Sequence, residues 1–291
     1  MTAIDELTTL VRDAAATASP AVVTIGRHGR GTGFVVATGK VLTNAHNLRD
    51  ETTEVGFADG RRVQGRLGGS DLDGDLVVLD VDTGDVRPLT WSTAAVAPGD
   101  VVVTVTAGRH RRRVTWGQVT AVEAAFRGPR GRLITGALEH TAPSAAGSSG
   151  APVLDRAGQV LAVNTHRLEH GFYLARTVDD ALRQVIDELV AGRRFERVRL
   201  GVGLAAPDVA ARLRRAVGLP ERDGLLVRSV VTDSPAERAG IRQGDLLTKA
   251  GDRALVVPDD LFAVLAGVEP GGRLTIELVR GADPATVTVT F

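Results

Sequence analysis

The sequence predicts a mainly β fold, an antiparallel barrel or sandwich, followed by a small α+β unit. Short runs rich in Val, Ile, Leu and Thr recur between residues 21 and 173, and clusters of Gly, Asp, Pro or Arg separate them. That stretch has almost no helical spacing of apolar residues. Helix and strand patterns then alternate over residues 199–291. These observations together predict two domains, which also suits a chain of 291 residues.

A helix is predicted over residues 4–17, because Ile4, Leu7 and Val11 follow a helical spacing and Ser19-Pro20 ends the pattern. A second helix is predicted over 177–190. The strands predicted between the two helices are 22–25, 33–37, 40–43, 76–81, 101–106, 117–122 and 160–165. We therefore expect an N-terminal helix (1–19), a β domain (20–191) and a linker (192–198).

The last domain, residues 199–291, has a mixed pattern of short elements. Its predicted strands are 200–204, 224–230, 245–250, 274–279 and 286–291, and its predicted helices are 209–217, 235–239 and 258–266. No internal repeat and no low-complexity tract is visible.

Composition excludes several classes of protein. Hydrophobic residues make up 43% and charged residues 24%, as in soluble globular proteins. The 35 basic and 35 acidic residues cancel, so nucleic acid is an unfavoured partner. Without cysteine there is no disulfide and no thiolate ligand or nucleophile. No stretch is long and apolar enough to span a membrane, and residues 1–21 lack the apolar core of a secretory leader. The expected location is cytoplasmic, or exported if a leader precedes this sequence.

Three segments carry residues suited to nucleophilic catalysis. His46 follows the apolar Val41-Leu42, Asp75 precedes the apolar run 76–79, and Ser149 lies in the glycine-flanked turn 147–150. A serine hydroxyl needs a base within hydrogen-bond reach, and histidine can accept that proton near neutral pH. An acid beside the histidine would fix its tautomer and stabilise the imidazolium. We predict that Ser149 is the nucleophile, His46 the base and Asp75 the acid.

Gly147 lies two residues before the predicted nucleophile. A glycine there lets the backbone turn so that successive N–H groups converge on one point. The N–H groups of Gly147 and Ser149 are therefore predicted to form an oxyanion hole, which stabilises the charge that develops on the scissile carbonyl.

The order His46, Asp75, Ser149 resembles that of the HtrA/Deg family of trypsin-like serine proteases. The matching stretches are 31–34 (GTGF), 42–46 (LTNAH), 75–79 (DLVVL), 117–121 (GQVTA) and 147–152 (GSSGAP). This resemblance implies a trypsin-like double β-barrel and a serine endopeptidase that cleaves unfolded or tagged proteins without ATP, metal or other cofactor. It also implies a homo-oligomer, a trimer.

The C-terminal unit resembles the PDZ domain that follows the protease in that family, most specifically over residues 234–245 (SPAERAGIRQGD). Leu200-Gly201-Val202-Gly203 resembles a carboxylate-binding loop, in which backbone N–H groups hold a peptide's C-terminus. A bound peptide would add as a strand next to 202–205, along a helix that carries Leu261 and Leu265. Peptide C-termini are thus the expected partners.

Two departures from the family pattern motivate an alternative function. The family usually has Asn and Gly where this chain has Ser148 and Ala151. The added methyl group of Ala151 could narrow the substrate channel, so the alternative is a catalytically idle peptide-binding scaffold or chaperone. No acid occurs over residues 141–146, and this argues against trypsin-like cleavage after Arg or Lys.

A zinc hydrolase is a third and weaker alternative. His166 and His170 fit the spacing H-x-x-E-H, which binds zinc when a helix presents both rings on one face. The flanking segments 161–165 and 172–175 have strand patterns instead. We therefore predict a hairpin loop there and no metal site.

Overall fold

The computed structural model describes residues 2–108, 112–195, 197–220 and 222–291. The chain divides into two compact units, residues 1–195 and residues 196–291. Each unit has its own buried apolar core.

The first half of unit 1 is a closed six-stranded barrel with the strand order β1-β2-β3-β6-β5-β4. Pairing of Thr24 with Gly56 and of Ile25 with Val55 closes it between β1 and β4. Its strands are β1 (Val22–Ile25), β2 (Gly31–Ala37), β3 (Lys40–Asn44), β4 (Thr52–Gly56), β5 (Arg62–Asp71) and β6 (Leu76–Asp80).

A second closed barrel follows, with the order β10-β11-β12-β9-β8-β7. Its strands are β7 (Val101–Ala107), β8 (Arg112–Arg127), β9 (Leu133–His140), β10 (Pro152–Leu154), β11 (Val160–Arg167) and β12 (Tyr173–Thr177). All neighbouring strands in both barrels are antiparallel. The predicted double antiparallel barrel is confirmed, and the sandwich is not formed.

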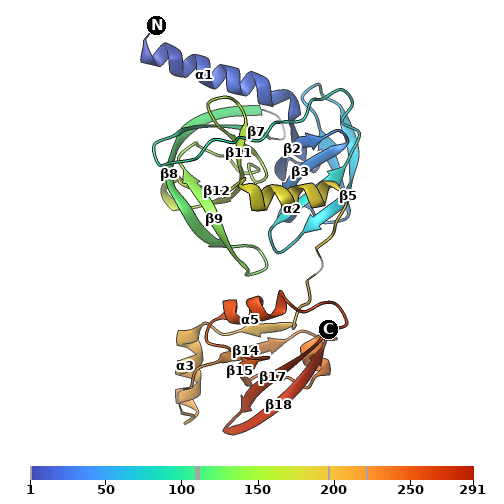
Figure 1. Ribbon diagram of the computed structural model, residues 1–291, viewed down its shortest axis with the longest axis vertical. Helices are drawn as coiled ribbons and strands as arrows, with labels where there is room; N and C mark the ends of the chain where they lie inside the picture. The colour runs from blue at the N-terminus through green and yellow to red at the C-terminus, as the bar shows by residue number, and fades with distance from the viewer. Residues whose placement is uncertain (1, 109–111, 196, 221) are drawn as a thin grey trace. The chain divides into compact units, whose positions relative to one another are not determined.

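Unit 1 also contains the helices α1 and α2 (Figure 1). Helix α1 (Ala3–Ala18) begins at a capping box formed by Thr2 and Asp5 and buries its last turn against the barrels. Helix α2 (Asp180–Val190) begins at Asp179, whose carboxylate accepts the Leu182 N–H at 2.7 Å. Its apolar face packs into the core of the unit. Short 3₁₀ turns lie at η1 (Ser19–Ala21), η2 (Ala45–Asn47) and η3 (Glu169–Gly171).

In unit 1 the sequence analysis did not predict β4, β5, β9 and β10, whereas the strand pattern at 172–175 corresponds to β12. Strand β5 contains charged residues and three glycines, and only some of its positions are buried, so its apolar alternation is weak. Strand β9 contains Gly136 with φ of +70°, and β10 has only three residues. Barrel closure, a non-local effect, determines these strands more than local propensity does.

Unit 2 has a sheet with the order β13-β14-β15-β17-β18, and β16 pairs with β15. Its elements are β13 (Val202–Leu204), α3 (Pro207–Ala216), β14 (Leu225–Val230), α4 (Pro235–Arg238), β15 (Leu246–Ala250), β16 (Arg253–Ala254), α5 (Pro258–Leu265), β17 (Arg273–Arg280) and β18 (Asp283–Thr290). Strand β13 forms one edge of the sheet, so within the described residues one side of its backbone pairs with no strand.

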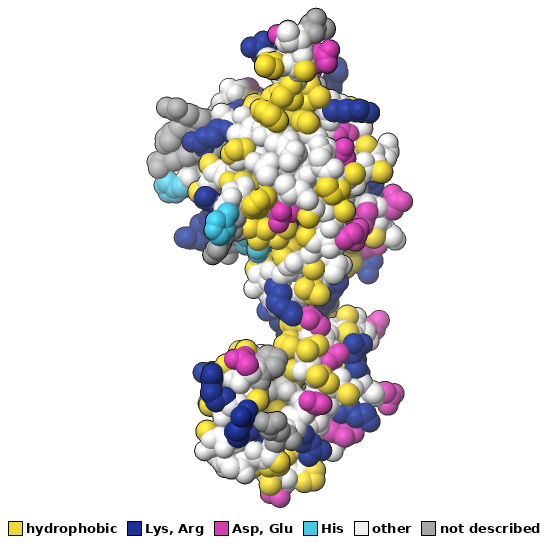
Figure 2. Space-filling model, turned by 90° about the vertical axis from the view of Figure 1, so that its left-hand side faces the viewer, with side chains coloured by type: hydrophobic (Ala, Val, Ile, Leu, Met, Phe, Trp, Pro, Cys, Tyr) yellow, Lys and Arg dark blue, Asp and Glu magenta, His cyan; other side chains and the backbone are white. Residues whose placement is uncertain are grey.

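Charged side chains of both signs are interspersed over the face shown in Figure 2, in keeping with the zero net charge. In the described parts of the chain, no helix has the length and apolar character needed to cross a membrane.

Candidate active site

His46 and Asp75 lie at neighbouring strand ends of the first barrel. His46 is in η2, immediately after β3, and Asp75 immediately precedes β6. Strands β3 and β6 pair antiparallel, with Asn44 opposite Leu76, so the end of one strand lies next to the start of the other. This register brings together two residues that are 29 positions apart.

The carboxylate of Asp75 holds His46 at two points. Asp75 Oδ2 lies 2.7 Å from Nδ1 of the ring, and Oδ1 accepts the main-chain N–H of His46 at 3.0 Å. The Asp75 side chain is almost fully buried, whereas the His46 side chain remains 32% exposed. The imidazole is therefore oriented by a desolvated acid while its other edge can meet a substrate.

The backbone of Asp75 is itself held in an uncommon conformation. Its φ is +59°, in the left-handed region that few residues other than glycine adopt. The Asp75 carbonyl accepts hydrogen bonds from the Asn44 side chain at 2.9 Å and from the Ala45 N–H at 3.1 Å. Such strained residues often occur at functional sites, where the surrounding structure holds them in place.

Ser149 lies in the turn before β10 and is fixed against the first barrel. Its carbonyl accepts the side-chain N–H of Asn47 at 2.9 Å and the main-chain N–H of Thr32 at 2.9 Å. The Ser149 hydroxyl donates to the carbonyl of Thr165 at 3.0 Å. Within the described residues, no hydrogen bond joins this hydroxyl to His46, so the serine must rotate to reach the ring.

The turn around Ser149 requires glycine at two positions. Gly147 has φ of +87° and Gly150 has φ of +84°. A Cβ at Gly150 would lie 2.2 Å from the carbonyl oxygen of Thr32, and one at Gly147 would lie 2.7 Å from that of Gly29. These close approaches pack the turn against the backbone around β2.

Two backbone N–H groups of this turn are free to bind an anion. Those of Gly147 and Ser149 donate to no acceptor among the residues that the structure describes. The Gly147 carbonyl, in contrast, accepts the Thr32 hydroxyl at 2.7 Å, which fixes its direction. Unpaired donors of this kind suit an oxyanion hole.

The surroundings of His46 can accommodate part of a substrate. The ring of His166, on β11, lies 6.4 Å from that of His46 and 5.0 Å from that of Phe126, between ring centroids. A hollow of about 520 Å³ adjoins His46 and Asp75 and is also lined by apolar side chains, including Leu48 and Leu72. The site thus combines polar groups with an open apolar surface.

His140, at the end of β9, is a buried titratable group that the sequence analysis did not identify. Its Nδ1 accepts the Ala142 N–H at 3.2 Å, so the ring proton is on Nε2, which has no partner among the described residues. The ring stacks on Tyr173, with 5.6 Å between centroids. Burial lowers the pKa of His140 to about 4, and a contact with Asn164 opposes this only in part. His140 is therefore neutral near pH 7.

Ala151 and the segment 166–170 are the two features on which the alternative functions were based. Ala151 lies immediately before β10 and is fully buried, so its methyl group is not exposed in an open channel. His166 lies near the end of β11 and His170 lies in η3, which connects β11 to its antiparallel partner β12, so the predicted hairpin connection is confirmed. The helical geometry needed for the H-x-x-E-H motif is absent at these described residues.

The structure places the predicted PDZ-site residues around β13. The carbonyls of Leu200 and Gly201 accept N–H groups from Ala236 and Val231, while their own N–H groups donate to no acceptor in the described part of the chain. Leu261 and Leu265, on α5, are buried in the core that also contains Leu200. The loop and the helix therefore share one apolar cluster next to a sheet edge.

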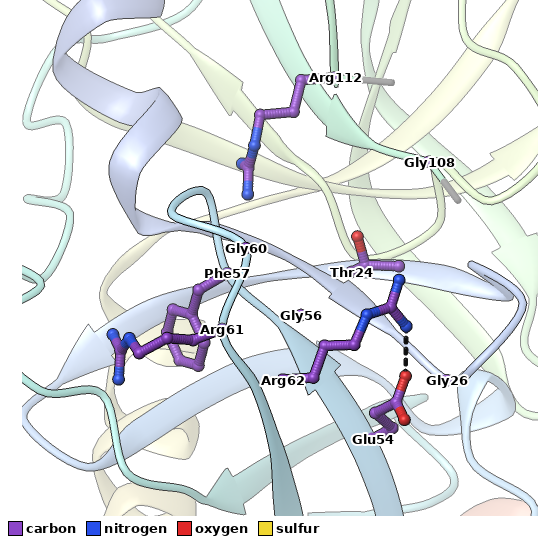
Figure 3. Close-up of a pocket in the computed structure, with 10 residues that line it drawn as sticks. All are labelled: Thr24, Gly26, Glu54, Gly56, Phe57, Gly60, Arg61, Arg62, Gly108 and Arg112. Carbon is purple, nitrogen blue, oxygen red and sulfur yellow. Dashed lines mark hydrogen bonds and ion pairs between the residues drawn. The ribbon is translucent and has the colours of Figure 1, made fainter. Parts of the chain in front are cut away.

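Figure 3 shows a separate hollow, which residues from both halves of unit 1 line and which does not include His46, Asp75 or Ser149. Its volume is about 210 Å³. Arg62 points toward Glu54 and forms an ion pair with it. The guanidinium of Arg112 donates to the main-chain carbonyls of residues 19 and 22. Arg62 and Arg112, which line this hollow, are thus already bound to other groups of the protein.

Two family models match the chain. The model of the trypsin-like peptidase domain matches residues 31–163, and the model of the PDZ domain matches residues 198–291. The first match includes His46, Asp75 and Ser149, and the second includes nearly all of unit 2.

Curated relatives resemble the chain over most of its length. A protein of Brucella suis named "Probable periplasmic serine endoprotease DegP-like" is 29% identical over 284 residues, covering 90% of this chain and 52% of the relative. A protein of the same name from Rhizobium meliloti is 30% identical over 271 residues, covering 88% and 51%. The chain thus spans about half the length of the curated relatives it matches.

Solved structures share its fold. "HtrA-type protease AlgW with decapeptide" superposes with a TM-score of 0.68 at 22% identity, covering 96% of this chain and 97% of the other. The serine endoprotease from Yersinia pestis superposes with a TM-score of 0.66 at 25% identity, covering 96% of each chain. These two solved structures therefore share the fold of this chain over nearly its whole length.

Proposed function

We propose that the chain is a serine endopeptidase of the HtrA/Deg family, in which a trypsin-like peptidase domain precedes a PDZ domain. Its substrates would be unfolded or tagged proteins, cleaved without ATP. The observation that best supports this proposal is that the buried Asp75 carboxylate makes two hydrogen bonds with His46. One joins Oδ2 to ring Nδ1 at 2.7 Å, and the other joins Oδ1 to the main-chain N–H at 3.0 Å. An acid placed in this way prepares the ring to act as a base.

In the proposed mechanism, Ser149 rotates its hydroxyl from the Thr165 carbonyl toward His46. Because Asp75 binds the Nδ1 side of the ring, Nε2 has the lone pair that accepts the serine proton. The serine oxygen then attacks the scissile carbonyl carbon, and the carbonyl π electrons move to its oxygen. Asp75 stabilises the imidazolium that results.

The free N–H groups of Gly147 and Ser149 would bind the oxyanion of the tetrahedral intermediate. The imidazolium of His46 gives its proton to the leaving amine as the C–N bond breaks. Water, deprotonated by the same ring, then hydrolyses the acyl-serine and restores the hydroxyl of Ser149.

Digestion of an unfolded protein such as β-casein tests the proposal. We expect the wild type to cleave it and Ser149→Ala to leave it intact. Ser148→Ala is a matched control, because it removes the adjacent hydroxyl in the same turn, and it should retain cleavage. Intact casein with the folded wild type, even in the presence of a C-terminal peptide for the PDZ domain, would contradict the proposal.

The alternative of a catalytically idle scaffold has no support. Both curated relatives described above are named serine endoproteases. Ala151, which motivated the alternative, is fully buried.

We also propose that the PDZ unit binds peptide C-termini at β13. The free N–H groups of Leu200 and Gly201 suit a carboxylate, and the unpaired edge of β13 suits a peptide that adds as a strand. Leu261 and Leu265 of α5 are buried in the same apolar cluster as Leu200, so they would hold this helix near the bound peptide. A trimeric assembly stays a prediction from the family resemblance.

For its location, we propose that the chain acts outside the cytoplasm. The relatives are named periplasmic proteins, whereas the cytoplasmic expectation gains no support. Fractionation of the cells that make the protein, followed by immunoblotting, tests this directly. Recovery only in the cytoplasmic fraction would contradict it.

A further inference from the structure

Both main-chain polar groups of Gly74, the residue before Asp75, are held by side chains. The Gly74 N–H donates to Asp71 Oδ1 at 2.9 Å, and the Gly74 carbonyl accepts a hydrogen bond from Arg176 Nη1 at 2.6 Å. Asp71 ends β5 of the first barrel, whereas Arg176 lies on β12 of the second. Side chains of both barrels therefore form hydrogen bonds with the turn that contains Asp75.

These groups are packed closely together. A Cβ on Gly74 would lie 2.1 Å from Asp71 Oδ2 and 3.0 Å from Arg176 Nη1. Asp71 is buried, and burial lowers the pKa of Arg176, although the neighbouring Asp71 and Asp75 oppose this. Arginine remains charged in proteins, so a cation lies behind the turn and its hydrogen bond is charge-assisted.

The peptide bond between Gly74 and Asp75 is planar, so the direction of the Gly74 carbonyl sets the direction of the Asp75 N–H. Asp75 has φ of +59°, a conformation that an L-residue does not readily adopt unaided. A side chain that fixes the preceding carbonyl therefore helps to keep Asp75 in this conformation. The direction of the Asp75 carboxylate toward His46 depends on it.

We infer that Arg176 is a positioning residue, which holds the Asp75 turn from the second barrel and so aligns the carboxylate with His46. The inference rests on the proposed function, because the alignment of Asp75 affects catalysis only if His46 accepts the proton of Ser149. Arg176 contacts neither the substrate nor the reacting atoms. Its effect passes through the Gly74 carbonyl to Asp75.

Three variants test this inference. Arg176→Met removes the charge and the donor but keeps most of the length, and Arg176→Lys keeps the charge and one donor. Arg183→Met is the matched control, because Arg183 on α2 also donates to a main-chain carbonyl, that of Ser92, but is not in contact with His46, Asp75 or Ser149. Tryptophan fluorescence verifies folding, since Trp91 and Trp116 both lie in unit 1.

Two readouts separate positioning from a purely structural role. In hydrolysis of a peptide substrate, Arg176→Met should lower kcat about 10- to 100-fold with KM nearly unchanged, because small misplacements of a reacting group are costly. The second readout is the downfield NMR signal of the His46 Nδ1 proton shared with Asp75, assigned by its absence in His46→Ala. It should weaken or shift in Arg176→Met, recover largely in Arg176→Lys and stay unchanged in Arg183→Met.

A folded Arg176→Met with wild-type kcat and an unchanged proton signal would overturn the inference. If Arg176→Met does not fold, Arg176→Gln replaces it, because its shorter side chain also lacks the charge and the guanidinium. A lower kcat and a weakened or shifted proton signal in folded Arg176→Gln support the inference, and wild-type kcat with an unchanged signal contradicts it. Failure of the wild type to hydrolyse any peptide would count against the proposed function. The proton signal tests the positioning without turnover, so the two failures are distinguishable.

Discussion

Asp75 uses both of its carboxylate oxygens on a single residue, His46. One oxygen accepts the main-chain N–H at 3.0 Å, and the other lies 2.7 Å from ring nitrogen Nδ1. The ring is thereby fixed relative to its own backbone, and the proton is placed on Nδ1. This leaves Nε2 as the acceptor that a serine nucleophile requires.

Replacement of Asp75 with Asn should therefore lower kcat strongly. An amide has one oxygen and one NH₂ group, so it cannot accept both hydrogen bonds from His46. If the NH₂ group faces Nδ1, the ring must move its proton to Nε2 and can no longer take one from Ser149. We expect kcat to fall by about 10⁴, as for the equivalent change in a chymotrypsin-type enzyme.

The Asp75→Asn variant should remain folded, because Asn tolerates a positive φ better than most residues. Peptide hydrolysis gives kcat, and circular dichroism gives the folding control. Turnover within tenfold of the wild type would show that the acid does not orient the base.

His140 should make the stability of unit 1 depend on pH. Its folded pKa of about 4 is below the ordinary value of 6.5, so the unfolded chain binds the proton more tightly. Stability is then full above about pH 6.5 and is lost as pH falls toward 4, by about 3 kcal/mol at pH 4. Urea unfolding followed by tryptophan fluorescence measures this loss in unit 1.

The His140→Gln variant lacks the titrating ring and should show a flatter dependence of the unfolding free energy between pH 6.5 and pH 4. His28→Gln serves as its control, because His28 is exposed, and it should keep the wild-type dependence. Equal slopes for wild type and His140→Gln would show that another group is responsible.

In unit 2, the buried carboxylate of Asp245 forms an ion pair with Arg280. Arg280 donates to both carboxylate oxygens at 2.8 Å, and the Arg242 N–H adds a third bond at 2.9 Å. Arg280→Met would leave a buried carboxylate without its cation, which is strongly unfavourable. We expect the thermal midpoint of unit 2 to fall by several degrees.

Calorimetry can follow both units, with tryptophan fluorescence assigning the transition of unit 1. The matched control is Lys249→Met, which breaks a more exposed pair with Glu277 at 3.4 Å and should change the midpoint little. Similar shifts for Arg280→Met and Lys249→Met would contradict the special role of Asp245.

Peptide binding by the PDZ unit should require a free carboxylate. A peptide with an apolar last residue and a free C-terminus should bind, and its C-terminal amide should bind at least tenfold more weakly, because the amide lacks the charge that the N–H groups of Leu200 and Gly201 would hold. Fluorescence titration of labelled peptides measures both affinities. Equal affinities would contradict the assignment of this loop.

The fold was predictable where local sequence carries the signal. The Val-rich strands β1, β3 and β6 and the helix α1 were each predicted within a few residues of their bounds. Strand β5 was not, because its glycines and charges hide the alternation that barrel closure imposes. Helix α2 begins at Asp180, three residues after the predicted start, because the cap at Asp179 sets its first turn.

The candidate site was predictable only in part, for a physical reason. Motifs in sequence order identified His46, Asp75 and Ser149, which the structure gathers around one region. The partners of Gly74 and Ser149 were not predictable: Arg176 is 102 positions from Gly74, and the carbonyl of Thr165 is a main-chain group with no sequence signal. Such contacts exist only once the two barrels have formed.

The most direct test of the central claim is covalent labelling of the wild type by a fluorophosphonate, measured by intact-protein mass spectrometry. An unactivated serine hydroxyl reacts negligibly, whereas a serine paired with a neutral imidazole reacts quickly. We predict that one label is added, on Ser149, and that Ser149→Ala abolishes it. A folded wild type that takes up no label, or takes it up on Ser148 or Ser144, would contradict the account.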